Sequence, residues 1–160
     1  MNSNYLVYDF DGVLCDSVLE CMITSYYAYS RQNSIDVPYN YSQNKIPKIY
    51  INSFIKFRPS VRAAKDFYIL WDMIFNEKSI IESLPLVKQW DVSDNIMDLF
   101  REIFYKERIA WCNSNISGWL DNNPLYQGVK KTLLSNKIKD NYFIVSSKDS
   151  DSIFRILQYN

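Results

Sequence analysis

The sequence predicts an α/β fold in which two strands of a parallel sheet are separated by a long helical insertion. Two short apolar runs rich in β-forming residues, Tyr5–Tyr8 and Tyr142–Val145, each lead into polar residues, as a buried strand does before a turn. Between them, apolar residues recur mainly at helical spacing. The order of strand, helix and further strand favours a parallel sheet, because parallel neighbours need a crossover connection.

The first strand, Tyr5–Tyr8, is followed by a turn at Gly12 and by a helix over Val18–Arg31, for which Ser17 is the expected cap. The later expected elements are a loop over Gln32–Lys48, a helix over Pro59–Glu77, a break over Ser83–Asp91, a helix from Ser93 to about Trp111, a linker over Asn113–Asn123, a helix near Gln127–Leu134, a strand over Asn141–Ser146 and a helix over Asp151–Tyr159.

Two domains follow from this order of elements. A single crossover needs only one helix, whereas the middle of the chain predicts several. We therefore expect a core made of residues 1–17 and 123–160, with residues 18–122 inserted as a helical subdomain.

Composition excludes several classes of function. The 160 residues hold 18 Lys and Arg against 18 Asp and Glu, so zero net charge gives no support for nucleic acid or an anionic membrane as partner. No apolar stretch is long enough to span a membrane and no signal-peptide pattern is present, so a cytoplasmic protein is expected. The chain has no histidine, which excludes catalytic triads and metal sites built on imidazole.

Two carboxylates follow the first strand, at Asp9 and Asp11. In a parallel sheet the ligand lies at the carboxyl ends of the strands, and residues two apart on an extended segment point the same way. Close carboxylates repel each other unless a cation intervenes, and Mg²⁺ prefers such oxygen ligands. One carboxylate can attack phosphorus while the other acts as acid and base. Gly12 lets the backbone approach a phosphate closely.

Residues 9–17, DFDGVLCDS, resemble motif I of the haloacid dehalogenase-like (HAD) superfamily, in the DxDGVLxDS form of its phosphoglycolate phosphatase and β-phosphoglucomutase-like branch. The resemblance implies a Rossmannoid core with Asp9 as nucleophile and metal ligand. It implies that Asp11 is the general acid and base, and that the main-chain carbonyl of Asp11 also binds the metal. The alternative is an ordinary acidic turn between a strand and a helix.

Residues 143–148, FIVSSK, resemble the second motif of the same superfamily, in which a strand ends on Ser or Thr. The resemblance makes Ser146 the hydroxyl that binds the phosphoryl group, with Ser147 and Lys148 beside it. Backbone N–H groups at the start of the next helix are further donors. Residues 124–129, PLYQGV, resemble the family's segment that returns from cap to core.

The family's third motif, a lysine, and its fourth, an acidic pair, are not found before Asn160. Lys148 is a candidate substitute for that lysine, whereas Asp149 and Asp151 are expected to cap the last helix. The resemblance thus covers about half of a family core sheet. We expect open sheet edges in a truncated or naturally short chain, or in one completed by a partner, including a homo-oligomer.

The insertion occupies the position of a C1-type helical cap, which in the family closes over the substrate. Three basic residues are candidates for contact with an anionic substrate, and the alternative is that they are solvated helix residues: Arg58, Arg62 and Lys65. Three tyrosines are candidates for lining the substrate pocket, and the alternative is that they pack in the core: Tyr26, Tyr27 and Tyr29.

The resemblance as a whole implies a Mg²⁺-dependent phosphatase that acts on a small phosphorylated metabolite through an aspartyl-phosphate. Two alternatives stay open. One is a catalytically incomplete binding or regulatory module, or an enzyme fragment, and the other is a phosphomutase or dehalogenase on the same scaffold.

Overall fold

The computed structural model describes residues 5–38, 40–78, 91–134 and 141–160, and the chain forms two compact units. The sheet unit comprises Met1–Leu19 and Ser117–Asn160, and the helical unit comprises Glu20–Ile116. These boundaries lie near the expected ones, although the assignment of core and inserted domain itself stays a prediction. The break expected over Ser83–Asp91 lies almost wholly outside the described residues.

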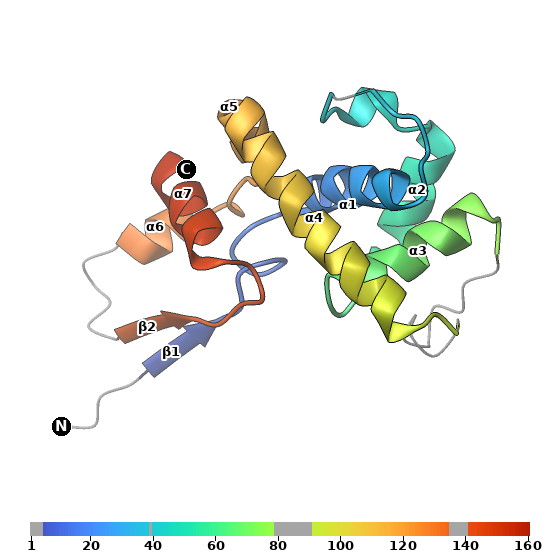
Figure 1. Cartoon of the computed structure of the whole chain (residues 1–160). Helices are drawn as coiled ribbons and strands as arrows, with labels where there is room; N and C mark the ends of the chain where they lie inside the picture. Colours follow the sequence, from blue (N-terminus) through green and yellow to red (C-terminus); the bar gives the residue numbers. More distant parts are fainter. Residues whose placement is uncertain (1–4, 39, 79–90, 135–140) are drawn as a thin grey trace. The chain divides into compact units, whose positions relative to one another are not determined.

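The predicted parallel pairing is confirmed in the sheet unit. Strands β1 (Tyr5–Tyr8) and β2 (Asn141–Ile144) run side by side in the same direction, with Tyr5 opposite Asn141 and Tyr8 opposite Ile144 (Figure 1). One more hydrogen bond extends the pairing, since the N–H of Val145 donates to the carbonyl of Tyr8 at 2.9 Å. The fold is therefore α/β in a limited sense: the described residues are mostly helical, with one two-stranded parallel sheet.

In the described parts of residues 116–160, the helices are α5 (Ile116–Asp121), α6 (Val129–Leu134) and α7 (Ser150–Tyr159). The linker expected over Asn113–Asn123 is wrong at its centre, because Trp119 and Leu120 of α5 are buried and favour a helical turn. The cap predicted for the last helix is confirmed, since the Asp149 carboxylate accepts a hydrogen bond from the N–H of Ser152 at 2.8 Å.

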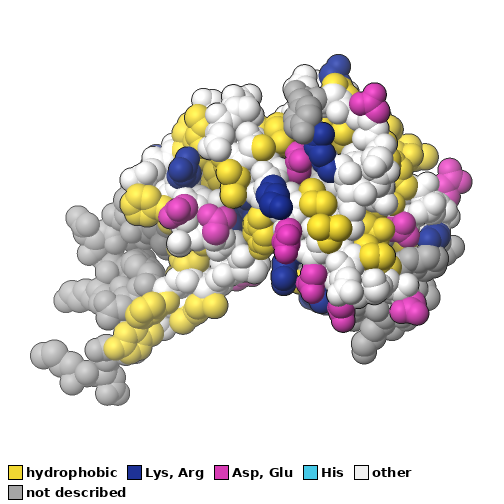
Figure 2. Space-filling view, viewed as in Figure 1, with side chains coloured by type: hydrophobic (Ala, Val, Ile, Leu, Met, Phe, Trp, Pro, Cys, Tyr) yellow, Lys and Arg dark blue, Asp and Glu magenta, His cyan; other side chains and the backbone are white. Residues whose placement is uncertain are grey.

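One face of the strand pair carries exposed apolar side chains. Strand residues alternate between the two faces, so the side chains that share this face are Tyr5, Val7, Phe143 and Val145. The rings of Tyr5 and Phe143 lie 5.8 Å apart, and Figure 2 shows hydrophobic side chains gathered over the strand pair. Parallel sheets usually have both faces covered, so this face is the expected position of a further packing element.

The helical unit is made of one continuous stretch of chain. The helices among its described residues are α1 (Val18–Gln32), which begins in the sheet unit, α2 (Lys48–Phe57), α3 (Asp66–Phe75) and α4 (Asp94–Ser114), and short 3-10 turns lie at Gln43–Lys45 and Arg58–Ser60. The predictions of helices α1 and α4 are confirmed. No helix among the described residues combines the length and the apolar character needed to cross a membrane.

The helix expected over Pro59–Glu77 is wrong in its first part. The Asp66 carboxylate accepts hydrogen bonds from the N–H groups of Arg62 at 2.8 Å and of Ala63 at 3.0 Å. These bonds fold residues 62–65 into a turn, and α3 starts only at Asp66. Helix α2 was not predicted from the sequence. Its apolar residues do not all face the core, since Ile49 and Ile55 are exposed.

Aromatic rings form the centre of the helical unit around Trp71. The Trp71 ring lies 5.3 Å from the ring of Tyr26 and 5.2 Å from that of Phe54, and its N–H donates to Ser25 Oγ at 2.8 Å. Tyr26, Tyr27 and Tyr29 are all buried, which confirms packing in the core as their role. Burial raises the pKa of the Tyr26 hydroxyl above its ordinary value.

A buried ion pair joins α1 to α4. Arg108 Nε lies 2.8 Å from Glu20 Oε1, and Arg108 Nη2 lies 2.9 Å from Glu20 Oε2. Glu20 is 0% exposed and Arg108 is 5% exposed. Thr24 Oγ1 donates to Glu20 at 2.9 Å, and the guanidinium lies 4.6 Å from the centre of the Phe104 ring. The two charges are paired in the forked geometry that a buried pair requires.

The buried face of α4 does not include all of its apolar residues. Ile96 and Leu99 share helical spacing with Phe100 and Phe104, but both are exposed. The buried face of α4 is formed by Met97, Phe100, Phe104, Glu107, Arg108 and Trp111. The buried face includes the charged residues Glu107 and Arg108, so it differs from the face that the spacing of apolar residues alone indicates.

We expect Arg108→Met to lower the free energy of unfolding by about 3 kcal/mol, because the change leaves the Glu20 carboxylate buried without its cation. Urea unfolding followed by circular dichroism measures the loss. The control is Arg101→Met on the same helix, where the partner is the half-exposed Asp98 at 3.5 Å. That change is expected to cost less than about 0.5 kcal/mol. Equal losses for the two variants would contradict a structural role for the buried pair.

Candidate functional site

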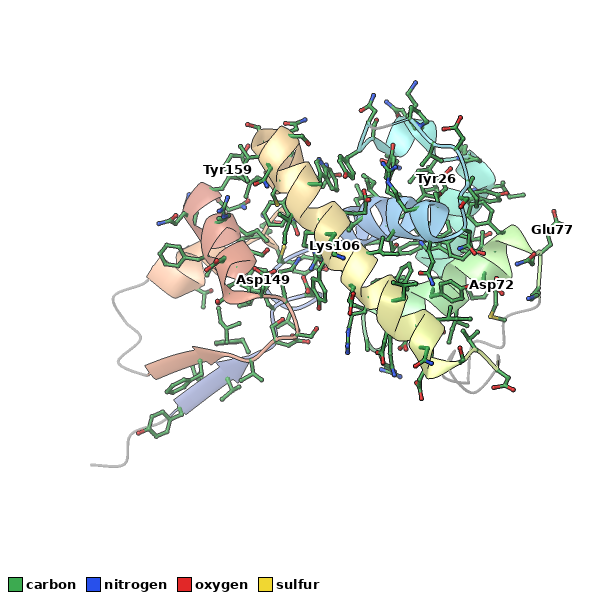
Figure 3. The ribbon with its side chains drawn as sticks, viewed as in Figure 1. Tyr26, Asp72, Glu77, Lys106, Asp149 and Tyr159 are labelled. Atoms are coloured by element: carbon green, nitrogen blue, oxygen red, sulfur yellow. The ribbon has the colours of Figure 1, made fainter. Side chains whose placement is uncertain are left out.

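The parallel pairing brings two polar segments to the same edge of the sheet. Asp9 and Asp11 follow β1, and Ser146, Ser147 and Lys148 follow β2. Because the carboxyl ends of parallel strands lie together, the two segments meet at that edge. All of the residues predicted for the site lie in the sheet unit, close to Asp149 at the start of α7, which is labelled in Figure 3.

The loop after β1 is a tight turn built on Phe10. The Phe10 side chain is buried, and its carbonyl accepts hydrogen bonds from the N–H groups of Leu14 at 2.9 Å and Cys15 at 3.0 Å. Gly12 has φ +81°, and its N–H donates to the Cys15 carbonyl at 2.8 Å. A glycine takes this left-handed conformation without the strain that a Cβ would cause. The turn therefore depends on Gly12.

The two carboxylates of the loop lie in different surroundings. Asp9 is exposed, and its Oδ1 accepts a hydrogen bond from the N–H of Phe10 at 2.7 Å. Asp11 is half-buried, and its Oδ1 is buried with no hydrogen-bond partner among the described residues. The cation paired with that oxygen is Lys148 Nζ, at 3.4 Å. The Asp9 carboxylate is thus accessible to a ligand, whereas the Asp11 carboxylate is paired with Lys148.

The segment after β2 turns back on itself at Ser146. Ser146 is half-buried, and its Oγ accepts a hydrogen bond from the N–H of Lys148 at 3.2 Å. Ser147 is exposed, whereas Lys148 is 5% exposed and points its ammonium group toward Asp11. The structure therefore places Lys148 beside the second carboxylate of the site. Its predicted contact with a phosphate stays a prediction.

The chain segment that follows α5 is bonded directly to the loop after β1. The carbonyl of Pro124 accepts a hydrogen bond from the N–H of Asp16 at 2.8 Å, and the carbonyl of Leu14 accepts one from the N–H of Tyr126 at 3.0 Å. Cys15 and Leu125 form an isolated antiparallel bridge. These bonds connect the loop after β1 to the segment that follows α5. No sequence pattern indicated them. Burial raises the pKa of the Tyr126 hydroxyl, and the negative charge of Asp16 adds to the rise.

Asn123 is a residue of this site that the sequence did not indicate. It is fully buried, and its Oδ1 lies 3.4 Å from Lys148 Nζ. In the sequence it is only the last residue of a segment rich in Asn, Ser and Gly. The one available signal was its position three residues after the apolar pair Trp119 and Leu120, at the spacing of one helical turn.

The site offers a partial set of oxygen ligands for Mg²⁺. Within the part of the chain that the structure describes, no three or more Asp, Glu, Cys and His side chains are grouped in a way that could hold a metal ion. The exposed Asp9 carboxylate is nevertheless a hard oxygen donor, and the main-chain carbonyl of Asp11 is a second one, whereas Asp11 Oδ1 faces the Lys148 ammonium. Mg²⁺ keeps several water ligands and is often bound through one or two carboxylates, so these residues fit the ion.

The candidate substrate cations of the helical unit have local roles. Lys65 Nζ pairs with Asp94 at 3.3 Å, and the Arg58 guanidinium lies 5.1 Å from the centre of the Phe67 ring. Arg62 is exposed. Contact of these three residues with an anionic substrate stays a prediction.

Comparison of the chain with protein-family models, with curated proteins and with solved structures found no match. The case for a function therefore depends on the residues at the ends of β1 and β2. There the chain brings together two carboxylates, a hydroxyl group and a buried ammonium group.

The contact between Lys148 and Asp11 predicts energetic coupling between the two residues. In a double-mutant cycle of Lys148→Met and Asp11→Asn, we expect a coupling free energy of about 1–2 kcal/mol, measured by urea unfolding. The matched cycle replaces Asp11→Asn by Asp9→Asn in the same loop. Since Asp9 is exposed, coupling there is expected to stay below about 0.5 kcal/mol. Coupling of equal size in both cycles would mean that Lys148 interacts with the total negative charge of the loop and not specifically with Asp11.

Proposed function

We propose that the chain is a Mg²⁺-dependent phosphomonoester hydrolase of the HAD type, acting on a small phosphorylated metabolite. In this proposal the sheet unit is the start of a Rossmannoid core and the helical unit is a C1-type cap. The observation that carries the proposal is the parallel pairing of β1 with β2, because it brings the segments that resemble the first two family motifs to one edge. The support is the geometry of the sheet unit together with the DFDGVLCDS and FIVSSK sequences.

Asp9 is the proposed nucleophile. Its carboxylate is exposed at the end of β1, so a phosphate monoester can approach it. Attack of a carboxylate oxygen on phosphorus forms the aspartyl-phosphate bond and breaks the bond between phosphorus and the ester oxygen. In the second step water attacks the same phosphorus and releases inorganic phosphate, which restores the carboxylate. The Ser146 hydroxyl and backbone N–H groups at the start of α7 orient the phosphoryl oxygens, and Gly12 lets the backbone come close to them.

Asp11 is the proposed acid and base. It gives a proton to the leaving alkoxide in the first step and takes one from the attacking water in the second. The Asp11 carboxyl group lies 3.4 Å from Lys148 Nζ. The proton that it gives to the leaving alkoxide is replaced by the proton that it takes from the attacking water, so the cycle returns Asp11 to its starting form.

Asp9 and Asp11 are the residues proposed to hold Mg²⁺. When bound, the ion neutralises negative charge on the transferring phosphoryl group. The two carboxylates repel each other, and a cation beside the exposed Asp9 would reduce this repulsion, as the Lys148 ammonium does at Asp11.

The remaining parts of the proposal rest on the layout of the chain. The helical unit is inserted between the two proposed motifs, which is the position of a C1-type cap. The exposed apolar face of the strand pair supports a homo-oligomer or another covering element. The cytoplasmic location expected from the sequence stays a prediction.

A second candidate function is a catalytically incomplete binding or regulatory module on the same fold. The observation that favours it is the small ligand set of the site, with one open carboxylate and a second one held by a buried lysine. Such a module binds inorganic phosphate or Mg²⁺ but does not turn over a phosphate ester. Turnover by the purified chain distinguishes the two functions.

Asp9→Asn is expected to abolish hydrolysis of a generic aryl phosphate in the presence of Mg²⁺, with a loss of at least about 10³-fold in kcat, because an amide does not attack phosphorus. Release of the aryl alcohol measures the rate. Borohydride reduction of the wild-type enzyme during turnover is expected to trap the acyl-phosphate at residue 9, which peptide mass spectrometry detects.

The control for Asp9→Asn is Asp149→Asn, which removes a carboxylate beside the site and keeps a good helix cap, since Asn caps as well as Asp. That variant is expected to keep its turnover within about threefold of the wild-type rate. Hydrolysis that survives Asp9→Asn would sink the assignment of the nucleophile.

Removal of divalent cations is expected to stop turnover. After treatment with EDTA the rate falls to background, and added Mg²⁺ restores it, because the phosphoryl charge is then neutralised again. The thermal midpoint of unfolding is measured on the same samples, to separate loss of the ion from loss of the fold. Turnover that is unaffected by EDTA would contradict the proposed role of Mg²⁺.

A further inference from the structure

The ammonium group of Lys148 is buried behind the end of β2. Its Nζ lies 3.4 Å from Asp11 Oδ1, 3.4 Å from Asn123 Oδ1 and 6.0 Å from the centre of the Trp119 ring. An ammonium group has three donors and no acceptor, and it is costly to bury without such partners. A carboxylate, an amide oxygen and an aromatic face together surround the charge. Asn123 supplies the neutral oxygen of this set.

The orientation of the Asn123 amide follows from its two neighbours. The Trp119 carbonyl is 2.9 Å from Nδ2 and only accepts hydrogen bonds, so the NH₂ group must face it. The Lys148 ammonium only donates, so Oδ1 must face the lysine. A flipped amide would place acceptor against acceptor and donor against donor. The oxygen of Asn123 is therefore directed at Lys148 by two independent contacts.

The backbone of Asn123 is held as firmly as its side chain. Its N–H donates to the Leu120 carbonyl at 2.9 Å, and its own carbonyl accepts from Asn160 Nδ2 at 3.4 Å. The residue is 0% exposed. Its neighbour Pro124 is bonded to the loop after β1 through Asp16. The amide oxygen thus sits at a fixed point relative to the loop that carries Asp11.

We propose that Asn123 is a positioning residue, which holds the Lys148 ammonium against Asp11 and so fixes the second carboxylate of the site. Asn123 acts through Lys148 and does not touch the reacting atoms. Its effect on catalysis rests on the phosphatase function proposed above, whereas its effect on the geometry does not. Without the amide oxygen, the ammonium loses an oxygen partner and shifts, which weakens its contact with Asp11.

The test is Asn123→Leu, which keeps a similar volume and removes the amide. The matched control is Asn122→Leu. Asn122 Nδ2 donates to the Gly118 carbonyl at 2.7 Å, which is the same contact with the residue four earlier at the same helix end. Lys148 has no described contact with Asn122, so the control removes the helix-end bond and leaves the ammonium in place.

The first readout is nuclear magnetic resonance of protein labelled at lysine and aspartate. The Lys148 ammonium and Asp11 carboxyl signals are assigned by their disappearance in Lys148→Arg and Asp11→Asn. Both signals are expected to shift in Asn123→Leu and to stay at their wild-type positions in Asn122→Leu. The second readout is hydrolysis of an aryl phosphate, for which Asn123→Leu is expected to lower kcat about tenfold and to change KM less than about twofold.

Unchanged Lys148 and Asp11 signals in folded Asn123→Leu would overturn the proposal, whatever the turnover. Absence of turnover in the wild-type chain would instead overturn the phosphatase function, and the signals would still decide the role of Asn123. If Asn123→Leu fails to fold, Asn123→Asp replaces it, because a new carboxylate draws the ammonium away from Asp11. Its two signals are then compared with those of Asn122→Asp, and the same shift supports the proposal while its absence overturns it.

Discussion

The parallel pairing of β1 with β2 is the constraint on which the candidate site depends. Each strand has only four residues, and a two-stranded sheet is marginal by itself in water. The pairing therefore needs support from the rest of the sheet unit, including the hydrogen-bonded turn that follows β1. With the strands in register, the ammonium of Lys148 reaches the carboxylate of Asp11. A shift of one residue would turn every strand side chain to the opposite face and would separate the two segments.

Further contacts then fix the residues of the candidate site. Gly12 permits the tight turn after β1, and that turn exposes Asp9 while it directs Asp11 inward. The segment from Asn123 to Tyr126 binds the backbone of the turn, and Asn123 holds the lysine behind it. The helical unit is stabilised separately, by an aromatic core and by the buried pair of Glu20 and Arg108. Local order in the two units thus has different physical origins.

Local patterns in the sequence predicted much of this structure, and tertiary contacts account for most of what they missed. Both strands, their parallel pairing and the helices α1, α4 and α7 follow from periodicity and capping residues. The residues before Asp66 were assigned to a helix, because no pattern shows that its carboxylate binds two N–H groups upstream.

The candidate site shows the same division between local and tertiary information. The order of the two motifs sufficed to predict that Asp9 and Asp11 lie on one edge with Ser146. The burial of Lys148 was not predictable, since it depends on Trp119 and Asn123, which belong to a segment whose composition resembles a linker.

The helical unit comes from one uninterrupted stretch of chain, whereas the sheet unit is made from both ends, and this difference has a consequence during synthesis on the ribosome. Residues 20–116 emerge together and can fold as soon as they are made, because their contacts are between segments of one continuous stretch. Strand β1 emerges before them but its partner β2 emerges after them. The edge of β1 that pairs with β2 is therefore open until β2 has been made, and the candidate site is assembled only after the residues of the helical unit have emerged.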